Sequence, residues 1–176
     1  MPYQALLENG VLKMKGDCVG LLQKTANSIL LKWQTKIMNI ICTNALHLQN
    51  RPRDSPVGSI LVLNGEIVGE GIEGGKTFKD ITFHSEIEAV RNARTLLQTP
   101  DLSDCIMYTT HEPCIMCSYV LRHHQIQTII IGLASGDIGG FSSQYPLLKD
   151  ENIRKWQKPP AVLFGILEEE CRQLSL

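Results

Sequence analysis

The sequence contains no uninterrupted apolar run of the roughly 18 residues that a membrane-spanning helix needs. It also has no excess of charge of either sign, because 17 lysines and arginines stand against 18 aspartates and glutamates, for a net charge of −1. A chain-wide positive field of the kind that attracts nucleic-acid phosphates is therefore excluded. We expect a soluble protein. The charge balance weighs mildly against a polynucleotide substrate, although a local basic stripe fits within a neutral total.

The cysteines lack the regular spacing of a disulfide framework, and the opening MPYQALLENG lacks the basic and apolar regions of a secretory signal. Both observations favour a reduced, cytoplasmic protein in which most thiols are small buried apolar groups. The six cysteines are Cys18, Cys42, Cys105, Cys114, Cys117 and Cys171.

The chain has 176 residues, 43% of them hydrophobic, which fits one compact domain with a sizeable core. Residues 1–20 stand apart as an N-terminal extension. Two short apolar arms around Asn9-Gly10 suggest a hairpin there, with a simple tail as the alternative. Residues 21–176 are expected to form the single domain, and they contain no internal repeat or low-complexity segment.

Apolar periodicity and turn residues predict the order of the regular elements. Helices are expected over residues 21–49, 84–98, 114–124, 146–157 and 166–176, and strands over residues 59–63, 66–71, 105–109, 128–132 and 161–165. The first two strands are joined at Asn64-Gly65, the best hairpin signal in the sequence. The alternation of strands and helices that follows predicts an α/β sandwich, in which helices cover both faces of a mixed sheet.

Two cysteines lie one helical turn apart directly after Pro113, a residue that suits the first position of a helix. Cys114 and Cys117 then share one face of the helix, where the positive end of the helix dipole favours thiolates. A Cys-x-x-Cys pair alone also fits a redox pair or half of a structural zinc site. A catalytic zinc site takes three protein ligands and leaves the fourth position for water.

The third ligand is expected to be a histidine at the tip of another element. His84 is the candidate, because His84-Ser85-Glu86 opens one predicted helix as Pro113 to Cys117 opens the next. Glu86 would then lie near the metal without binding it, in a position to take a proton from water and return it to the substrate. Glu112, just before the cysteines, is expected to interact with the helix dipole.

The HSE and PCIMC segments together match the H-x-E…P-C-x-x-C signature of the zinc-dependent cytidine-deaminase-like superfamily. Further blocks, SPVGSILVLNGEIVGEG, HSEIEAVRNA, MYTTHEPCIMCSYVL and TIIIGL, resemble the branch of tRNA-adenosine, guanine and cytosine deaminases. The resemblance spans roughly residues 25–172.

This resemblance implies Zn²⁺ held by His84, Cys114 and Cys117, with Glu86 as proton shuttle. It implies that the backbone N–H of Ser85 touches the base and that the backbone N–H of Cys114 stabilises the water or the developing oxygen. It also implies a three-layer α/β/α sandwich with a five-stranded mixed sheet, and a homodimer. The reaction expected is the hydrolytic release of ammonia from an amino-substituted heterocycle.

The chain departs from the family at Glu73, where relatives commonly carry a substrate-binding asparagine eleven positions before the zinc histidine. An ionised carboxylate only accepts hydrogen bonds, so we expect a substrate that presents an N–H or amino group there. The alternative is that Glu73 points to solvent. The other expected substrate contacts are Val57, Gly58, Ser85, Phe141 and Tyr145, with the two aromatic rings as a candidate lid or as simple packing.

Three functions follow from these features. A deaminase of a free nucleobase-like ring, of the guanine, aminopurine or aminotriazine type, or of a nucleoside is favoured by the neutral charge, by Glu73 and by the few residues that follow Cys171. A tRNA-specific adenosine deaminase is the alternative, supported by the strength of the block similarity. A catalytically silent zinc-binding scaffold is the third, disfavoured because Glu86 is intact.

Overall fold

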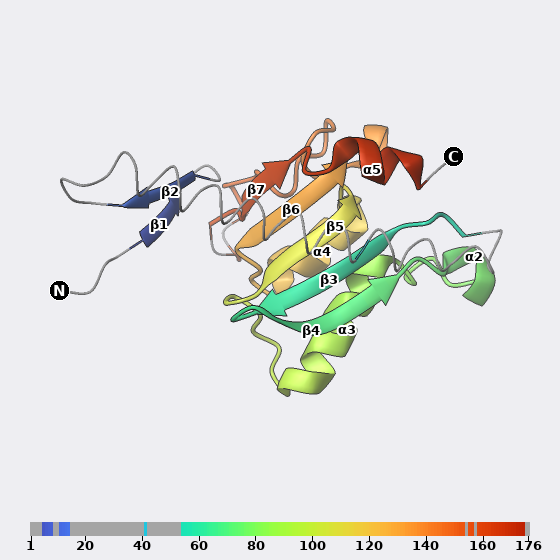
Figure 1. Cartoon of the computed structure of the whole chain (residues 1–176), viewed down its shortest axis with the longest axis horizontal. Helices are drawn as coiled ribbons and strands as arrows, with labels where there is room; N and C mark the ends of the chain where they lie inside the picture. The colour runs from blue at the N-terminus through green and yellow to red at the C-terminus, as the bar shows by residue number, and fades with distance from the viewer. Residues whose placement is uncertain are drawn as a thin grey trace.

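The computed structural model describes residues 5–8, 11–14, 41, 54–153, 155–156 and 158–174. A five-stranded sheet in the order β4-β3-β5-β6-β7 forms its centre (Figure 1). The strands are β3 (Gly58–Leu63), β4 (Glu66–Ile72), β5 (Ile106–His111), β6 (Thr128–Leu133) and β7 (Ala161–Phe164). The helices are α2 (Gly75–Phe78), α3 (Ser85–Leu97), α4 (Ile115–His123) and α5 (Glu168–Gln173), with a 3-10 turn η2 (Gly136–Ile138).

The sheet is mixed, as the sequence predicts. Strand β3 pairs antiparallel with both β4 and β5, whereas β6 runs parallel to β5 and to β7. The β3–β4 hairpin turns at Asn64 and Gly65, whose φ angles of 51° and 88° are both in the left-handed region that a two-residue turn of this type requires. The predicted hairpin is thereby confirmed.

The strands bury side chains on both faces, which explains their continuous apolar runs. Leu61, Met107 and Ile129 face one core cluster, which α3 and α4 complete. Ile60 and Ile130, one residue away, face a second cluster, which includes Cys171 of α5. The helices therefore cover both faces of the sheet, and this three-layer arrangement matches the expected fold (Figure 1).

Helix α3 lies unusually close to β4 because two glycines of that strand face it. A Cβ added at Gly69 would overlap the carbonyl oxygen of Ala89, and one added at Gly71 would overlap the carbonyl oxygen of Ser85. Only a residue without a side chain allows this approach. The glycines thus fix the position of the first turn of α3.

Two parts of the C-terminal half differ from the expected elements. Residues 147–149 form a turn and residues 150–153 are irregular, so the helix expected from residue 146 onward is wrong over this stretch. The guanidinium of Arg122 explains the difference, because its Nη1 donates to the carbonyl oxygens of Leu147 (2.7 Å) and Asp150 (3.0 Å) and holds the segment open.

The short helix α2 was not expected from the sequence. The carboxylate of Asp54 holds its first turn by accepting hydrogen bonds from the backbone N–H groups of Lys76 (3.0 Å) and Thr77 (3.1 Å). These partners lie more than 20 residues away from Asp54 in the chain, so local sequence gave no signal for them.

The helix predicted over residues 21–49 lies outside the described residues, except for Ile41, which is helical and buried in the second cluster. Near the N-terminus, β1 (Ala5–Glu8) and β2 (Val11–Met14) pair antiparallel with each other. In the part of the chain that the structure describes, no helix is both long enough and apolar enough to span a membrane.

Candidate metal centre and active site

Two helix N-termini meet at the candidate site. His84 immediately precedes α3 and Cys114 immediately precedes α4, and each has extended backbone angles. Their carbonyl groups accept the first helical hydrogen bonds, from the N–H of Glu88 (3.0 Å) and of Ser118 (2.8 Å) respectively. Both residues therefore occupy N-cap positions, where the side chain lies beside the helix end and close to its exposed N–H groups.

The structure brings together the three residues expected to bind metal. The Nδ1 atom of His84 lies 3.6 Å from Sγ of Cys114 and 3.4 Å from Sγ of Cys117. The three candidate donor atoms all lie within 4.8 Å of one another. This is the one group of histidine, cysteine and acidic side chains in the described part of the chain that has metal-binding spacing.

The geometry of this group fits zinc. A tetrahedral Zn²⁺ has Zn–S bonds of about 2.3 Å and Zn–N bonds of about 2.0–2.1 Å, which places sulfur and nitrogen ligands about 3.5 Å apart. The observed separations of 3.6 and 3.4 Å agree with that value. Two thiols and one imidazole are also the donor types that zinc prefers, and three protein ligands leave a fourth position for water or substrate.

Hydrogen bonds among the three side chains set their charges. A hydrogen bond from Cys117 lowers the pKa of Cys114 to about 4, and the same bond, together with burial, raises the pKa of Cys117 far above its usual range. A hydrogen bond to Cys114 raises the pKa of His84 to about 9. Metal uptake releases protons, because zinc binds cysteine as the thiolate and histidine as the neutral imidazole.

Glu86 lies beside the metal ligands, as the sequence predicts. Its Oε2 is 3.6 Å from Sγ of Cys117 and accepts a hydrogen bond from Oγ of Ser85 at 3.1 Å. The residue is only 4% exposed, and this burial raises the pKa of its carboxyl group to about 7. A carboxyl group that titrates near neutral pH can both take up and release a proton under ordinary conditions.

A chain of buried hydroxyl groups supports Ser85 from behind. Its Oγ lies 2.8 Å from Oγ of Ser59, which donates to Oγ1 of Thr109 (2.9 Å), which in turn donates to the carbonyl oxygen of His111 (2.8 Å). Sequence analysis missed Ser59 and Thr109. The available signal was that each is a small polar residue inside an otherwise apolar strand, and the register of the sheet pairs them directly.

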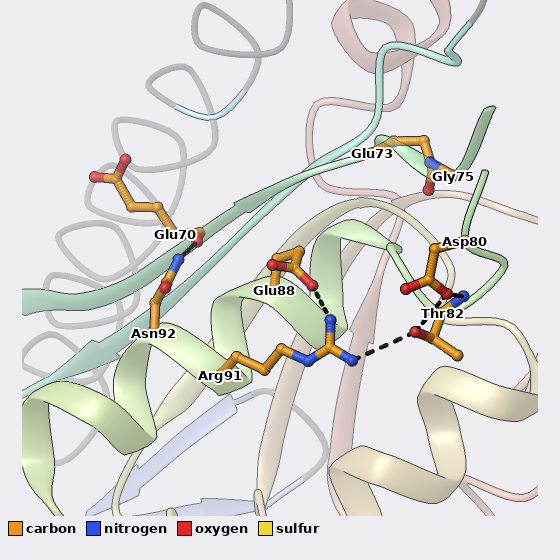
Figure 2. Close-up of polar contacts among 8 residues, drawn as sticks. All are labelled: Glu70, Glu73, Gly75, Asp80, Thr82, Glu88, Arg91 and Asn92. Atoms are coloured by element: carbon orange, nitrogen blue, oxygen red, sulfur yellow. Dashed lines mark hydrogen bonds and ion pairs between the residues drawn. The ribbon is translucent and has the colours of Figure 1, made fainter. Parts of the chain in front are cut away.

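Glu73 lies after β4, close enough to His84 for its negative charge to contribute to the raised pKa of that imidazole. Its Oε1 accepts a hydrogen bond from the N–H of Gly75 at 2.9 Å (Figure 2). The side chain is half-buried, so it does not simply point into solvent. One of its carboxylate oxygens is engaged by the loop that leads to α3.

Val57 and Gly58 lie beside Glu73 through backbone contacts. The carbonyl oxygen of Val57 accepts a hydrogen bond from the N–H of Glu73 at 2.9 Å. The N–H of Gly58 donates to Oγ1 of Thr110 at 3.2 Å, near the end of β5. The start of β3 thus runs between Glu73 and the strand that leads to the metal-binding cysteines.

The two aromatic residues considered for a lid lie in different surroundings. The ring of Phe141 packs against the first core cluster, stacks on Phe164 with ring centroids 6.0 Å apart, and lies 4.0 Å from Nζ of Lys149. Tyr145 is 52% exposed and lines an open hollow of about 670 Å³ together with Pro146, Lys149, Asn152 and neighbouring residues. The structure therefore does not place the two rings together.

Comparisons with known proteins agree with this chemistry. A family model described as the cytidine and deoxycytidylate deaminase zinc-binding region matches residues 31–133. The tRNA-specific adenosine deaminase of Aquifex aeolicus (strain VF5) is 36% identical over 123 residues, which cover 68% of this chain and 78% of that protein.

Two solved structures are also similar. One, from a study of A-to-I editing by tRNA:A34 deaminases at the wobble position of transfer RNA, has a TM-score of 0.72 and 25% identity. The match covers 80% of this chain and 99% of that one. The guanine deaminase of Bacillus subtilis has a TM-score of 0.52 and 31% identity, over 55% of this chain and 62% of that one.

Proposed function

The chain belongs to the cytidine and deoxycytidylate deaminase zinc-binding family, and we propose that it is a deaminase of adenosine in tRNA. The family and the relatives make it a hydrolytic deaminase whose cofactor is Zn²⁺. The choice of tRNA adenosine as substrate is supported by the A. aeolicus relative and by the similar structure from the study of tRNA:A34 deaminases. Sequence analysis placed a free base first, and these likenesses reverse the order.

The observation that carries the deaminase chemistry is the buried carboxyl group of Glu86 next to three residues with zinc-binding geometry. The chemistry that Zn²⁺ supplies when bound in such a site is the activation of a water molecule, whose pKa falls to about 7. The carboxylate of Glu86 would take one proton from the water and pass it to the ring nitrogen next to the amino-bearing carbon as the carbon–oxygen bond forms. It would then carry the second proton from the new hydroxyl group to the amino group, so that the carbon–nitrogen bond breaks and ammonia leaves.

We assign the remaining roles by position. The hydroxyl chain behind Ser85 fixes the first turn of α3, so that the backbone N–H of Ser85 faces the base. The backbone N–H of Cys114 stabilises developing negative charge on oxygen. Val57, Gly58 and Glu73 form one side of the substrate site, and Phe141 supports the other side through its packing. We assign Tyr145 to contacts at the outer rim.

A free base of the guanine type is the second candidate. Glu73 favours it, because Oε1 is held by Gly75 while Oε2 has no hydrogen bond among the described residues and can accept one from an amino group. The likeness to the guanine deaminase of B. subtilis points the same way. We further propose a cytoplasmic location, since thiol ligands stay unoxidised in a reducing compartment. The homodimer implied by the family resemblance is also kept as a proposal.

A comparison of substrates tests the proposal. The purified, zinc-loaded protein is incubated separately with tRNA transcripts that carry an adenosine at the wobble position, with adenosine, and with guanine, and ammonia and inosine are measured. We expect inosine to form in the tRNA. Turnover of guanine with no reaction on tRNA would replace the first candidate by the second. Glu86→Gln protein is the control for contaminating deaminases.

A further inference from the structure

The carboxylate of Glu112 is the hub of a hydrogen-bond network outside the reacting groups. It accepts hydrogen bonds from the backbone N–H groups of Ser135 (3.2 Å), Phe141 (2.7 Å) and Ser142 (2.7 Å), and from Oγ of Ser142 (2.6 Å). The residue is 2% exposed. All of these donors come from the loop of residues 134–142, which follows β6, so one buried side chain holds the two ends of this loop.

The carboxylate meets only hydrogen-bond donors in this network. Oε1 accepts from the N–H groups of Phe141 and Ser142, and Oε2 accepts from the N–H of Ser135 and from Oγ of Ser142. The sequence suggested that Glu112 interacts with the dipole of the next helix. The structure shows instead that α4 begins only at Ile115 and that the carboxylate faces the amides of the loop.

The same loop lies directly against a metal ligand. Gly139 forms a β-bridge with Cys114, and the N–H of Gly140 donates to the carbonyl oxygen of Pro113 at 2.8 Å. A Cβ added at Gly139 would overlap the Glu112 carboxylate, and one added at Gly140 would overlap Oγ of Ser118. Bare backbone is all that fits between Glu112, the start of α4 and the loop.

We propose that Glu112 is a positioning residue of the active site. Its carboxylate fixes the loop of residues 134–142 against Cys114, and this loop forms the wall of the substrate site next to Cys114. The assignment of a substrate to this wall rests on the proposed deaminase function. Glu112 does not touch the reacting atoms. Its effect reaches the substrate through the backbone of the loop.

The chemistry of the network explains why a carboxylate is needed. Every partner is a donor, and only an ionised carboxylate offers two oxygens that accept in all directions. Glutamine at this position would turn an amide NH₂ group toward N–H donors and leave one or two of them unsatisfied. Glu112→Gln therefore keeps the size of the side chain while breaking about half of the network.

The test compares Glu112→Gln with two further variants in the zinc-loaded protein. Ser142→Ala removes a single hydroxyl donor, and Asp137→Asn removes an exposed carboxylate from the same loop as the control. Three quantities are measured: zinc content, hydrogen–deuterium exchange of residues 135–142, and KM and kcat for deamination.

For Glu112→Gln we expect one zinc per chain, exchange in the loop about tenfold faster or more, and a KM raised about tenfold with kcat changed less than about threefold. Ser142→Ala should change exchange and KM in the same direction but less, and Asp137→Asn should match the unmodified protein. If Glu112→Gln fails to fold, Ser142→Ala tests the proposal instead. Rates of loop exchange and a KM equal to those of Asp137→Asn would then overturn the proposal.

Two other results would overturn it. Loss of zinc in Glu112→Gln would mean that the residue acts on the metal ligands, and unchanged exchange would mean that it does not hold the loop. The exchange measurement needs no substrate. A failure of the proposed deaminase function, seen as an unmodified protein without turnover, is therefore distinguishable from a failure of this inference.

Discussion

Two loops flank the metal ligands, and they are held in contrasting ways. The loop of residues 73–83, before α3, is held by exposed and half-buried side chains, and its rings of Phe78 and Phe83 pack on each other with centroids 4.2 Å apart. Asp54 accepts hydrogen bonds from the backbone N–H groups of Lys76 and Thr77. Arg91 reaches from α3 to the Oγ1 of Thr82 (3.3 Å) while it pairs with Glu88 (Figure 2). The loop of residues 134–142 is held by the buried carboxylate of Glu112.

Because their contacts differ in burial, we expect the loop of residues 134–142 to be the more rigid and the loop of residues 73–83 the more mobile. Exposed ion pairs contribute roughly 0–1 kcal/mol each, because water and salt screen them. Hydrogen bonds to a buried charge are roughly twice as strong as neutral ones. The network around Glu112 therefore holds the backbone of residues 134–142 beside Cys114 more tightly than the exposed contacts hold the loop of residues 73–83.

The first prediction removes the centre that both loops surround. Cys117→Ala is expected to reduce bound zinc from one per chain to nearly none and to destabilise both loops, since metal binding of this kind carries on the order of 10 kcal/mol. Metal analysis and thermal unfolding measure the two effects. Cys105→Ala, which removes a buried thiol from the core, is the matched control and should keep its zinc. Full zinc content in Cys117→Ala would disprove the ligand assignment.

The second prediction concerns the proton transfer itself and leaves both loops unchanged. Glu86→Gln should lower kcat by about 10²–10⁴-fold, because the amide cannot carry the proton, while zinc content stays at one per chain. Steady-state ammonia release and metal analysis measure these quantities. Glu88→Gln, two residues along the same helix, should retain activity, and equal rates in the two variants would refute the role of Glu86.

The third prediction concerns a substitution within the loop of residues 134–142. Gly139→Ala places a methyl group against the Glu112 carboxylate and should lower the free energy of unfolding by about 1–3 kcal/mol, the usual range for overpacking. Denaturant unfolding gives the value. Asp137→Ala, at an exposed position of the same loop, should have little effect. If both variants unfold alike, the loop is not the rigid frame described above.

The fourth prediction probes substrate choice in the exposed loop. Glu73→Asn introduces an amide that can both donate and accept, so we expect the ratio of kcat/KM for adenosine-type over guanine-type substrates to rise about tenfold. Competition between the two substrates measures the ratio directly. Glu70→Gln, an exposed acid on β4, should leave it unchanged. An unaltered ratio in Glu73→Asn would remove Glu73 from the substrate site.

The smallest effect is expected at Arg91, whose side chain is 49% exposed and pairs with Glu88, whose side chain is 17% exposed. Arg91→Ala should lower the free energy of unfolding by less than about 1 kcal/mol. The difference should shrink further in 1 M salt, which screens exposed charges. Denaturant titrations at two salt concentrations measure both quantities. A larger loss of unfolding free energy that salt does not reduce would show that the two loops are held equally strongly.

Sequence reasoning reached those features that depend on short-range pattern. Asn64-Gly65 specified a hairpin, helical apolar spacing identified α3 and α4, and the HxE and CxxC spacings identified the residues that meet around the metal. Each of these signals consists of residues that are close together in the sequence. Local sequence was therefore sufficient to predict these features.

The features that sequence reasoning missed depend on contacts between distant segments. The role of Glu112 could not be predicted, because its partners lie 23 to 30 residues away and three of the four are backbone amides, which any residue except proline supplies. The hydroxyl chain through Ser59 and Thr109 appears only once β3 and β5 are in register. Arg122 likewise overrides the helical pattern after residue 146 through carbonyl contacts that no local pattern encodes.

Zinc X-ray absorption spectroscopy of the purified protein tests the central claim most directly. The arrangement of His84, Cys114 and Cys117 predicts two sulfur ligands at about 2.3 Å, one imidazole nitrogen at about 2.0–2.1 Å, and one further light atom that no residue of the described part of the chain supplies. A spectrum with four sulfur ligands, or with two imidazoles and two sulfurs, would show a closed structural site and contradict the account.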